Sequence, residues 1–293
     1  MEGSVELSSQ IRTVGIIYNS RIPEALDVST AIVNELSLEQ SSWISPAENL
    51  EELREQVTST DLVVTAGGDG TMLRAVQLTA PLKVPMVGIN MGRLGFMTEL
   101  QVHDALEKLP TYYNGSVRID SHNMITARII RGSHTSLPGE EGPFHALNDV
   151  VMSRGAVSRV VTIRTTVDGA EVASLRADGI ILATATGSTG YSLAVGGPIL
   201  DPLSESLVLK PVAAHVGLSA SLVLAPEARV GLHLEGAQGA VLSVDGYFER
   251  PLHPGDRVEI EQSPHKARFL RAQPPSHFYS TLTRRLGFSI RGQ

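Results

Sequence analysis

The segment Gly67–Thr71 (GGDGT) places one carboxylate, Asp69, among three glycines where an apolar run ends and a helical pattern begins. Glycine lets backbone N–H groups approach a ligand closely, and a helix N-terminus adds partial positive charge, so the loop favours phosphate. A carboxylate next to phosphate is repelled unless a divalent cation shields it or it accepts a hydroxyl proton. The loop therefore indicates phosphoryl chemistry, or else a plain turn with Asp69 as helix N-cap. It matches neither the P-loop nor the Rossmann G-x-G-x-x-G pattern.

A longer stretch, residues 178–200 (DGIILATATGSTGYSLAVGGPIL), runs from an apolar strand into small, hydroxyl-bearing residues. Many hydroxyl donors and acceptors on a glycine-rich backbone suit a sugar, an amide or a base edge better than a metal ion. Tyr191 in this stretch either stacks on a base or anchors the loop. The stretch predicts a binding loop rather than a plain surface loop.

The pair Asn148-Asp149 stands directly before another apolar strand. It forms either a clamp on ribose hydroxyls or a base amine, or an ordinary turn, because Asn and Asp are common in turns. The residues themselves leave both interpretations open.

Residues 90–99 (NMGRLGFMTE) follow the third strand of the α/β pattern, with Gly92 and Gly95 on either side of Arg93. Ligands bind at the carboxyl ends of strands in open α/β sheets, so we expect this segment on the same edge as Gly67–Thr71. The alternative is a connector between domains with Phe96 in the core.

The elements that must position these candidates alternate, in the first part of the chain, between apolar strands and helical patterns. This order predicts a parallel, Rossmann-like α/β sheet. Pro46 followed by Glu48 and Glu51 predicts a helix start with an acidic first turn. We expect strands at 13–19, 61–66 and 84–89, a weaker strand at 43–44, and helices at 23–36 and 71–79.

The pattern changes near residues 114–115, after which strands follow one another with turn residues and little helix. Asp168-Gly169 is a hairpin turn of the Asp-Gly kind. Such a run predicts an all-β, sandwich-like domain. The expected strands are 125–130, 150–152, 160–167, 172–175, 180–183, 222–224, 230–234, 240–244 and 258–260.

An amphipathic pattern at 278–286, after Pro274-Pro275, predicts a final helix that packs back on the first domain. We therefore expect three parts. They are an α/β domain 1–115 that carries the GGDGT loop, a β-rich domain 116–273 that binds the ligand, and the C-terminal helix segment 274–293.

The composition excludes several classes of protein. The 293 residues are 42% hydrophobic and 19% charged, which excludes disorder as the main state. The absence of cysteine excludes disulfides and thiolate metal sites, and the formal net charge of −7 disfavours nucleic-acid binding. Residues 1–10 lack a signal-peptide pattern, and no apolar run approaches the ~20 residues that span a bilayer, so we expect a cytoplasmic protein. The nine histidines show no metal-ligand spacing; His215 is the one of interest.

Together these segments resemble the NAD kinase family over most of the chain. The family pattern is a GGDGT loop, an N-x-G-x-x-G-F segment, an Asn-Glu or Asn-Asp pair before a strand, a long DG…T-G-S-T-x-Y-S…GGP stretch and a late Asp-Gly. Here these segments occur in the same order, at 67–71, 90–96, 148–149, 178–198 and 245–246. GGDGT alone also occurs in diacylglycerol and sphingoid kinases, whereas the long stretch is far more specific.

The resemblance implies an enzyme that phosphorylates the 2′-hydroxyl of the adenosine ribose of NAD to give NADP. It implies that Asp69 is the general base and that Gly67, Gly68, Gly70 and Thr71 hold the phosphoryl donor. The residues implied to bind NAD are Asp69, Gly70, Arg74, Phe96, Asn148, Asp149, Arg159, Arg176, Asp178, Thr189, Gly190, Tyr191, Ser192, Leu193, Ala194 and Asp245.

The resemblance also implies a divalent cation, Mg²⁺, held by phosphates and water rather than by a protein cage. The donor is ATP or polyphosphate. The implied assembly is a homodimer or homotetramer in which the β-rich domain supplies the interface and completes a neighbour's site.

Four positions depart from the family pattern: Gly190 for Ala, Asp149 for Glu, Ala214 for a second proline and Tyr247 for Gln. They bear on binding at the nicotinamide side. Two other classes compete. A lipid kinase that shares only GGDGT needs an apolar or basic patch facing a membrane. A nucleotide-binding regulator needs no carboxylate, yet Asp69 is present.

Overall fold

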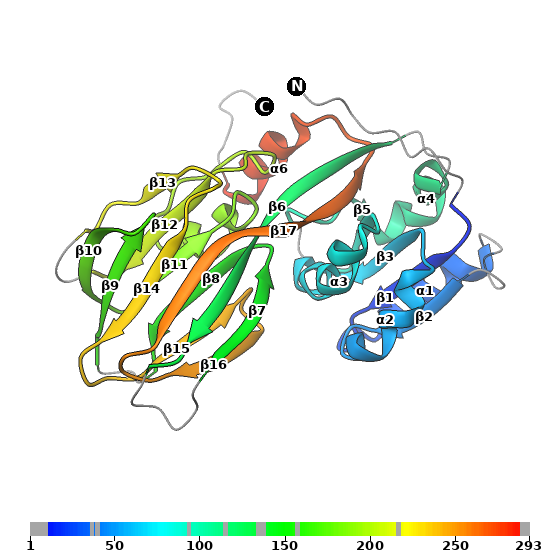
Figure 1. Ribbon diagram of the computed structural model, residues 1–293. Helices are drawn as coiled ribbons and strands as arrows, with labels where there is room; N and C mark the ends of the chain where they lie inside the picture. The colour runs from blue at the N-terminus through cyan, green and yellow to red at the C-terminus, as the bar shows by residue number, and fades with distance from the viewer. Residues whose placement is uncertain are drawn as a thin grey trace, which may run out of the picture. The chain divides into compact units, whose positions relative to one another are not determined.

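The computed structural model describes residues 11–35, 38, 42–92, 95–113, 117–132, 139–155, 159–214 and 218–287 (Figure 1). His215, Arg93 and Leu94 lie outside the described residues. The chain divides into an α/β unit, Met1–Ser121 with Ala267–Gln293, and a β unit, His122–Lys266. Two long strands, β6 (Arg118–Ile130) and β17 (Arg257–Arg271), run from one unit into the other.

The α/β unit contains a parallel sheet in the order β2-β1-β3-β4-β17, in which β17 joins through Phe269 opposite Met86. Strands β1 and β3 are almost completely buried, as expected for near-continuous apolar runs in a parallel sheet. The strands are β1 (Val14–Tyr18), β2 (Ser42–Pro46), β3 (Leu62–Gly67), β4 (Met86–Asn90) and β5 (Leu100–Gln101). The helices are α1 (Glu24–Glu35), η1 (Leu50–Leu53), α2 (Arg54–Thr58), α3 (Asp69–Leu82), η2 (Val102–Asp104), α4 (Ala105–Tyr113) and α6 (His277–Arg285).

The helix predicted to start at Pro46 is wrong. Pro46 is the last residue of β2 and pairs with Tyr18, and helical structure begins only at Leu50. Strand β2 is the last strand of the sheet on its side, and an edge strand tolerates a proline because it need not donate on its free side. Helix α4 was not predicted, although its buried residues Ala105, Leu109 and Tyr112 have helical spacing.

The β unit contains two mainly antiparallel sheets whose inner faces share one core, including Ile163 and Leu232 from one sheet and Met152 and Leu182 from the other. One sheet has the order β10-β9-β14-β17, with β6 and β7 joined to β17; the other has the order β13-β12-β11-β8-β15-β16. The further elements are β7 (Glu140–Ala146), β8 (Asp149–Arg154), β9 (Val161–Val167), β10 (Ala170–Ala177), β11 (Gly179–Ala183), η3 (Gly187–Thr189), α5 (Tyr191–Ala194), β12 (Leu207–Val212), β13 (Leu222–Leu224), β14 (Val230–Glu235), β15 (Ala240–Val244) and β16 (Phe248–Leu252).

The predicted fold class is confirmed. The first unit is α/β with a parallel sheet, the second is a β-sandwich, and the final helix α6 belongs to the α/β unit. The hairpin at Asp168-Gly169 is also confirmed, since both residues have positive φ, 50° and 81°, and join the antiparallel strands β9 and β10.

Candidate functional site

In the α/β unit, two of the predicted loops start from neighbouring strand ends. Gly67 at the end of β3 pairs with Asn90 at the end of β4, so both loops begin on the same edge of the sheet. Asp69 is the first residue of α3, and Gly68 takes the N-cap position with no side-chain cap. The Asp69 carboxylate instead accepts hydrogen bonds from the backbone N–H groups of Phe96 (2.9 Å) and Met97 (3.1 Å). Asp69 therefore joins the two loops and is not the N-cap of α3.

The glycines of these loops have two different roles. An added Cβ would meet nothing within 4 Å at Gly68 or Gly70, so the backbone at the start of α3 is open to a ligand. At Gly95, in contrast, a Cβ would lie 2.1 Å from Asp69 Oδ1. The carboxylate occupies the space that any other residue at position 95 would need.

Gly95→Ala is therefore expected to displace the Asp69 carboxylate from its two N–H donors. We expect turnover to fall by about tenfold, because a small misplacement of a reacting group is costly. Gly92→Ala is the matched control, since an added Cβ there meets nothing within 4 Å. Steady-state kinetics of both variants measure the effect. Equal activity of the two variants would contradict this account of Gly95.

Phe96 is half-buried rather than in the core, and its ring contacts helix α6. The ring centroids of Phe96 and Phe278 are 6.0 Å apart. The guanidinium of Arg285 lies 4.2 Å from the Phe96 ring centroid, and its Nη1 is 3.8 Å from Asp69 Oδ2. Sequence reasoning did not find Arg285, which is far from Asp69 along the chain. Arg74, the other basic candidate of this unit, is half-buried on α3.

In the β unit, three strand ends bring a second group of predicted residues together. Strands β11 and β15 both run antiparallel to β8, with Ala183 opposite Asp149 and Val244 opposite Val150. The stretch that follows β11, the residue Asp245 that follows β15, and the pair Asn148-Asp149 at the start of β8 therefore meet at one end of the sheet.

The Asp245 carboxylate holds the Asn148 turn through backbone hydrogen bonds. Oδ2 accepts the N–H of Leu147 (2.9 Å), and Oδ1 accepts those of Asn148 (2.7 Å) and Asp149 (3.1 Å). The N–H of Asp245 in turn donates to the Asp149 carbonyl (3.0 Å). Both carboxylate oxygens are engaged with the backbone, so Asp245 serves to position the Asn148-Asp149 pair.

The side chains of Asp149 and Asp245 are both buried. Burial, together with the nearby charge of Asp245, raises the pKa of Asp149 to about 7. Burial also raises the pKa of Asp245 to about 6, although its three backbone hydrogen bonds act in the opposite direction. Two carboxyl groups so close share their titration, and the pair holds a proton near neutral pH.

These raised pKa values predict a pH dependence of stability. The Asp149 carboxyl has a pKa near 4 in the unfolded chain and of about 7 in the native state. At pH values between these two, the native state therefore binds more protons than the unfolded chain. The stabilising contribution is thus complete below about pH 4 and is lost as the pH rises through 7. Asp149→Asn should therefore gain stability relative to the wild type between about pH 5 and pH 8. Urea unfolding at a series of pH values measures this, with Asp168→Asn in an exposed turn as control; a pH-independent difference would contradict it.

The stretch after β11 packs closely on the Asn148 turn. The Thr184 hydroxyl donates to the Leu147 carbonyl (2.5 Å), and the Thr184 N–H donates to the Asn148 carbonyl (2.9 Å). A Cβ at Gly187 would lie 2.0 Å from that same carbonyl oxygen. A Cβ at Gly190 would lie 4.0 Å from both Asn148 Nδ2 and Asp149 Oδ2, so the backbone there runs past both polar side chains.

The hydroxyl groups of this stretch differ in their hydrogen-bond partners and in their exposure. The Ser188 hydroxyl donates to Ala185 (2.6 Å) and that of Thr189 to Thr186 (3.1 Å), so both close local turns. Ser192 is fully buried, and its hydroxyl has no hydrogen-bond partner among the described residues. Tyr191 is 46% exposed. Leu193 is half-buried and Ala194 exposed, at the end of α5.

Three predicted residues lie away from this group within the β unit. Asp178 precedes β11, whose first residue Gly179 pairs with Ser153, so it stands at the opposite end of β11 from the Asn148 turn. It forms an ion pair with Arg154 (3.2 Å). Arg176 is exposed on β10, and exposed Arg159 donates to Gln238 (3.1 Å).

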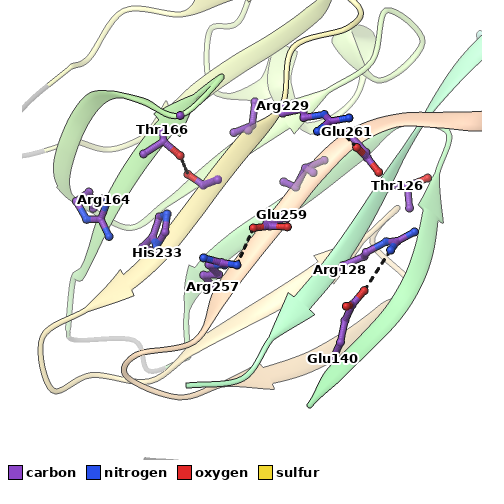
Figure 2. Close-up of a pocket in the computed structure, with 14 residues that line it drawn as sticks. Thr126, Arg128, Glu140, Arg164, Thr166, Arg229, His233, Arg257, Glu259 and Glu261 are labelled. Atoms are coloured by element: carbon purple, nitrogen blue, oxygen red, sulfur yellow. Dashed lines mark hydrogen bonds and ion pairs between the residues drawn. The ribbon is translucent and has the colours of Figure 1, made fainter. Parts of the chain in front are cut away.

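A separate pocket of about 490 Å³ lies on the sheet formed by β9, β14, β17, β6 and β7, and none of the predicted site residues lines it. Figure 2 shows its charged side chains in facing pairs, such as Arg128 with Glu140 (3.2 Å) and Arg257 with Glu259 (3.0 Å). Arg229 and Arg164 also have carboxylate partners, Glu261 and Glu235. Each of these arginines has a carboxylate partner, which reduces the attraction of the pocket for the phosphates of a dinucleotide.

The described residues contain no group of three or more His, Asp or Glu side chains that could hold a metal ion. Within the same described ranges, no helix is both long and apolar enough to cross a bilayer.

An α/β unit with an open, glycine-rich loop at the carboxyl edge of a parallel sheet, joined to a β-sandwich, defines a two-domain protein of the phosphate- and nucleotide-binding class. Two protein-family models match the chain: the ATP-NAD kinase N-terminal domain at residues 22–117 and the ATP-NAD kinase C-terminal domain at residues 147–272. The chain belongs to the NAD kinase family.

Named relatives agree with this assignment. The chain is 36% identical over 276 residues to an NAD kinase of Dehalococcoides mccartyi, covering 94% of this chain and 96% of that protein. It is also 36% identical over 283 residues to an NAD kinase of Chloroflexus aurantiacus, covering 94% and 99%.

Solved structures share the fold. A yeast NADH kinase solved with NADH has a TM-score of 0.84 at 21% identity, covering 98% of this chain and 90% of that one. An NAD kinase of Archaeoglobus fulgidus solved with ATP has a TM-score of 0.74 at 24% identity, covering 94% and 100%.

Proposed function

We propose that this protein transfers a phosphoryl group from ATP or polyphosphate to the 2′-hydroxyl of the adenosine ribose of NAD, giving NADP. The observation that carries the proposal is the Asp69 carboxylate, fixed by two backbone N–H groups beside the open backbone of Gly68 and Gly70. Membership of the NAD kinase family and the curated relatives support the same reaction.

In the proposed reaction, Asp69 accepts the proton of the ribose 2′-hydroxyl. The hydroxyl oxygen forms a bond to the terminal phosphorus of the donor, and the bond from that phosphorus to the leaving phosphate oxygen breaks. A carboxylate has about four lone-pair sites, and the two N–H groups occupy only two of them. Asp69 is therefore oriented by the loop and still able to accept a proton. Most of the catalysis comes from alignment of donor and acceptor and from neutralisation of charge.

The group around the Asn148 turn is proposed to bind the nucleoside parts of NAD. Asn148 and Asp149 provide polar side chains beside the backbone of Gly190, and Tyr191 offers an exposed ring. A carboxyl group that keeps its proton near neutral pH is able to donate a hydrogen bond as well as accept one. The other residues proposed to contact NAD, by resemblance to the family, are Gly70, Arg74, Phe96, Arg159, Arg176, Asp178, Thr189, Ser192, Leu193, Ala194 and Asp245.

The donor set near Asp69 fits a magnesium ion that is held mainly by phosphates and water. One carboxylate with adjacent hydroxyl and backbone groups is too few ligands for a protein cage, and Mg²⁺ commonly keeps phosphate and water ligands. When bound, the ion would neutralise charge on the transferring phosphoryl group.

We further propose that the protein is cytoplasmic and assembles as a homodimer or homotetramer through its β unit. This part of the proposal rests on resemblance to the family, in which the β-rich domain supplies the interface between subunits. By the same resemblance, the β unit would also complete a neighbour's site. Sedimentation velocity of the purified chain measures the assembly.

The direct test is an assay of the purified chain with NAD, Mg²⁺ and either ATP or polyphosphate, in which NADP is measured with an NADP-specific dehydrogenase. NADP formation is expected with at least one donor. Phosphorylation of diacylglycerol instead would indicate a lipid kinase, and NAD binding without any transfer would indicate a regulator.

A further inference from the structure

The structure places a protein cation, the guanidinium of Arg285, beside Asp69. Its Nη1 lies 3.8 Å from Asp69 Oδ2, and the two side chains are 40% and 26% exposed. At this distance the two groups form an ion pair but no hydrogen bond, so the N–H groups of the guanidinium do not donate to the carboxylate. Both residues belong to the α/β unit.

Aromatic contacts hold Arg285 at this position. Its guanidinium stacks over the Phe96 ring at 4.2 Å, a distance at which a cation–π interaction is favourable. Phe96 also contacts Phe278, which lies two turns before Arg285 on the same face of α6, and Phe278 contacts Tyr279 (5.3 Å). The Phe96 ring therefore supports the guanidinium beside the Asp69 carboxylate.

The chemistry proposed for this loop requires a positive charge here. A phosphoryl donor brings several negative charges to Gly68–Gly70, where the Asp69 carboxylate already stands. The N-terminus of α3 supplies only partial charge. Arg presents a planar fork of N–H donors that matches phosphate oxygens in a bidentate manner.

We propose that Arg285, on the C-terminal helix, is a binding residue for the terminal phosphates of the phosphoryl donor. In the free protein it forms an ion pair with Asp69, and it turns its N–H edge to the donor while remaining stacked on Phe96. This inference rests on the proposed function, because it takes the Gly67–Thr71 loop as the donor site. Its substrate class is a linear polyphosphate, free or as part of a nucleotide.

The test compares Arg285→Ala and Arg285→Lys with Arg284→Ala, the matched control. Arg284 is exposed, adjacent in sequence and in the same last helical turn, so it shares any interaction with the helix dipole. We expect Arg285→Ala to raise the KM for ATP about tenfold or more, with the KM for NAD within about twofold. Arg285→Lys should recover part of the loss, because it keeps the charge but not the fork. Arg284→Ala should resemble the wild type.

A second measurement separates this inference from the proposed function. Inorganic tripolyphosphate with Mg²⁺ is titrated into each protein by calorimetry, which needs no turnover. Weaker binding by Arg285→Ala than by Arg284→Ala supports the inference even if no NADP is formed by the wild type. Equal binding by the two variants, or a rise in the KM for NAD alone, overturns it while leaving wild-type NADP formation as a separate result.

Discussion

Asp69→Asn is expected to lower kcat for NADP formation by about 10²- to 10⁴-fold, the range that a positioned general base contributes. An amide cannot accept the proton of the ribose 2′-hydroxyl. The substitution keeps the size of the side chain, so the new amide fits against Gly95 as the Asp69 carboxylate does. Single-turnover and steady-state measurements with saturating donor and NAD give kcat directly.

Binding of NAD by Asp69→Asn should remain largely intact, and calorimetric titration with NAD measures it. In the asparagine one carboxylate oxygen is replaced by an NH₂ group, which donates and so cannot accept the backbone N–H of Phe96 or Met97. One hydrogen bond between the two loops is therefore lost, and we expect the protein to be slightly less stable. Thermal unfolding compared with the wild type shows its extent. Equal losses of NAD affinity and turnover would mark Asp69 as a structural residue that ties the two loops together.

The sequence predicts most of the elements on which this site depends, because the site stands at the ends of strongly apolar strands. Strands β1 and β3 are buried along their length and appear as continuous apolar runs. The sequence pattern does not indicate strands β7 and β16, because most of their residues are exposed or half-buried, each contains a proline and neither shows a regular alternation. Strand β12 was missed because it contains Lys210 and Pro211.

Within the site, residue types were predictable and partners were not. The GGDGT loop marks Asp69 as a candidate, but its backbone partners are 27 and 28 positions away, and nothing in the loop points to them. Arg285 occurs in an ordinary amphipathic helix, where an arginine in the last turn needs no special explanation. Contacts between distant segments depend on the fold, and local sequence patterns do not contain them.

The role of Asp245 also could not be predicted from the sequence, in which only the Asp245-Gly246 pair distinguishes it. Its carboxylate accepts three backbone N–H groups at the Asn148 turn, and its φ is +51°. Asp245→Ala leaves three backbone donors, two buried and one half-buried, without an acceptor. At about 1 kcal/mol each, we expect the free energy of unfolding to fall by about 3 kcal/mol. An alanine also disfavours positive φ. The KM for NAD should rise as the Asn148-Asp149 pair loses its position.

The chain offers a matched control for Asp245→Ala in a second Asp-Gly pair. Asp168 also has positive φ (50°), precedes a glycine and accepts one backbone N–H, from Arg229, in an exposed turn. Asp168→Ala should therefore lose about 1 kcal/mol and keep its KM for NAD. Asp245→Asn retains an oxygen that can accept from Asn148 and Asp149, so it should recover much of the stability and the KM. If Asp245→Ala and Asp168→Ala unfold at the same urea concentration with the same KM, the Asn148 turn is held by its contacts with Thr184 and Gly187, and Asp245 has no positioning role.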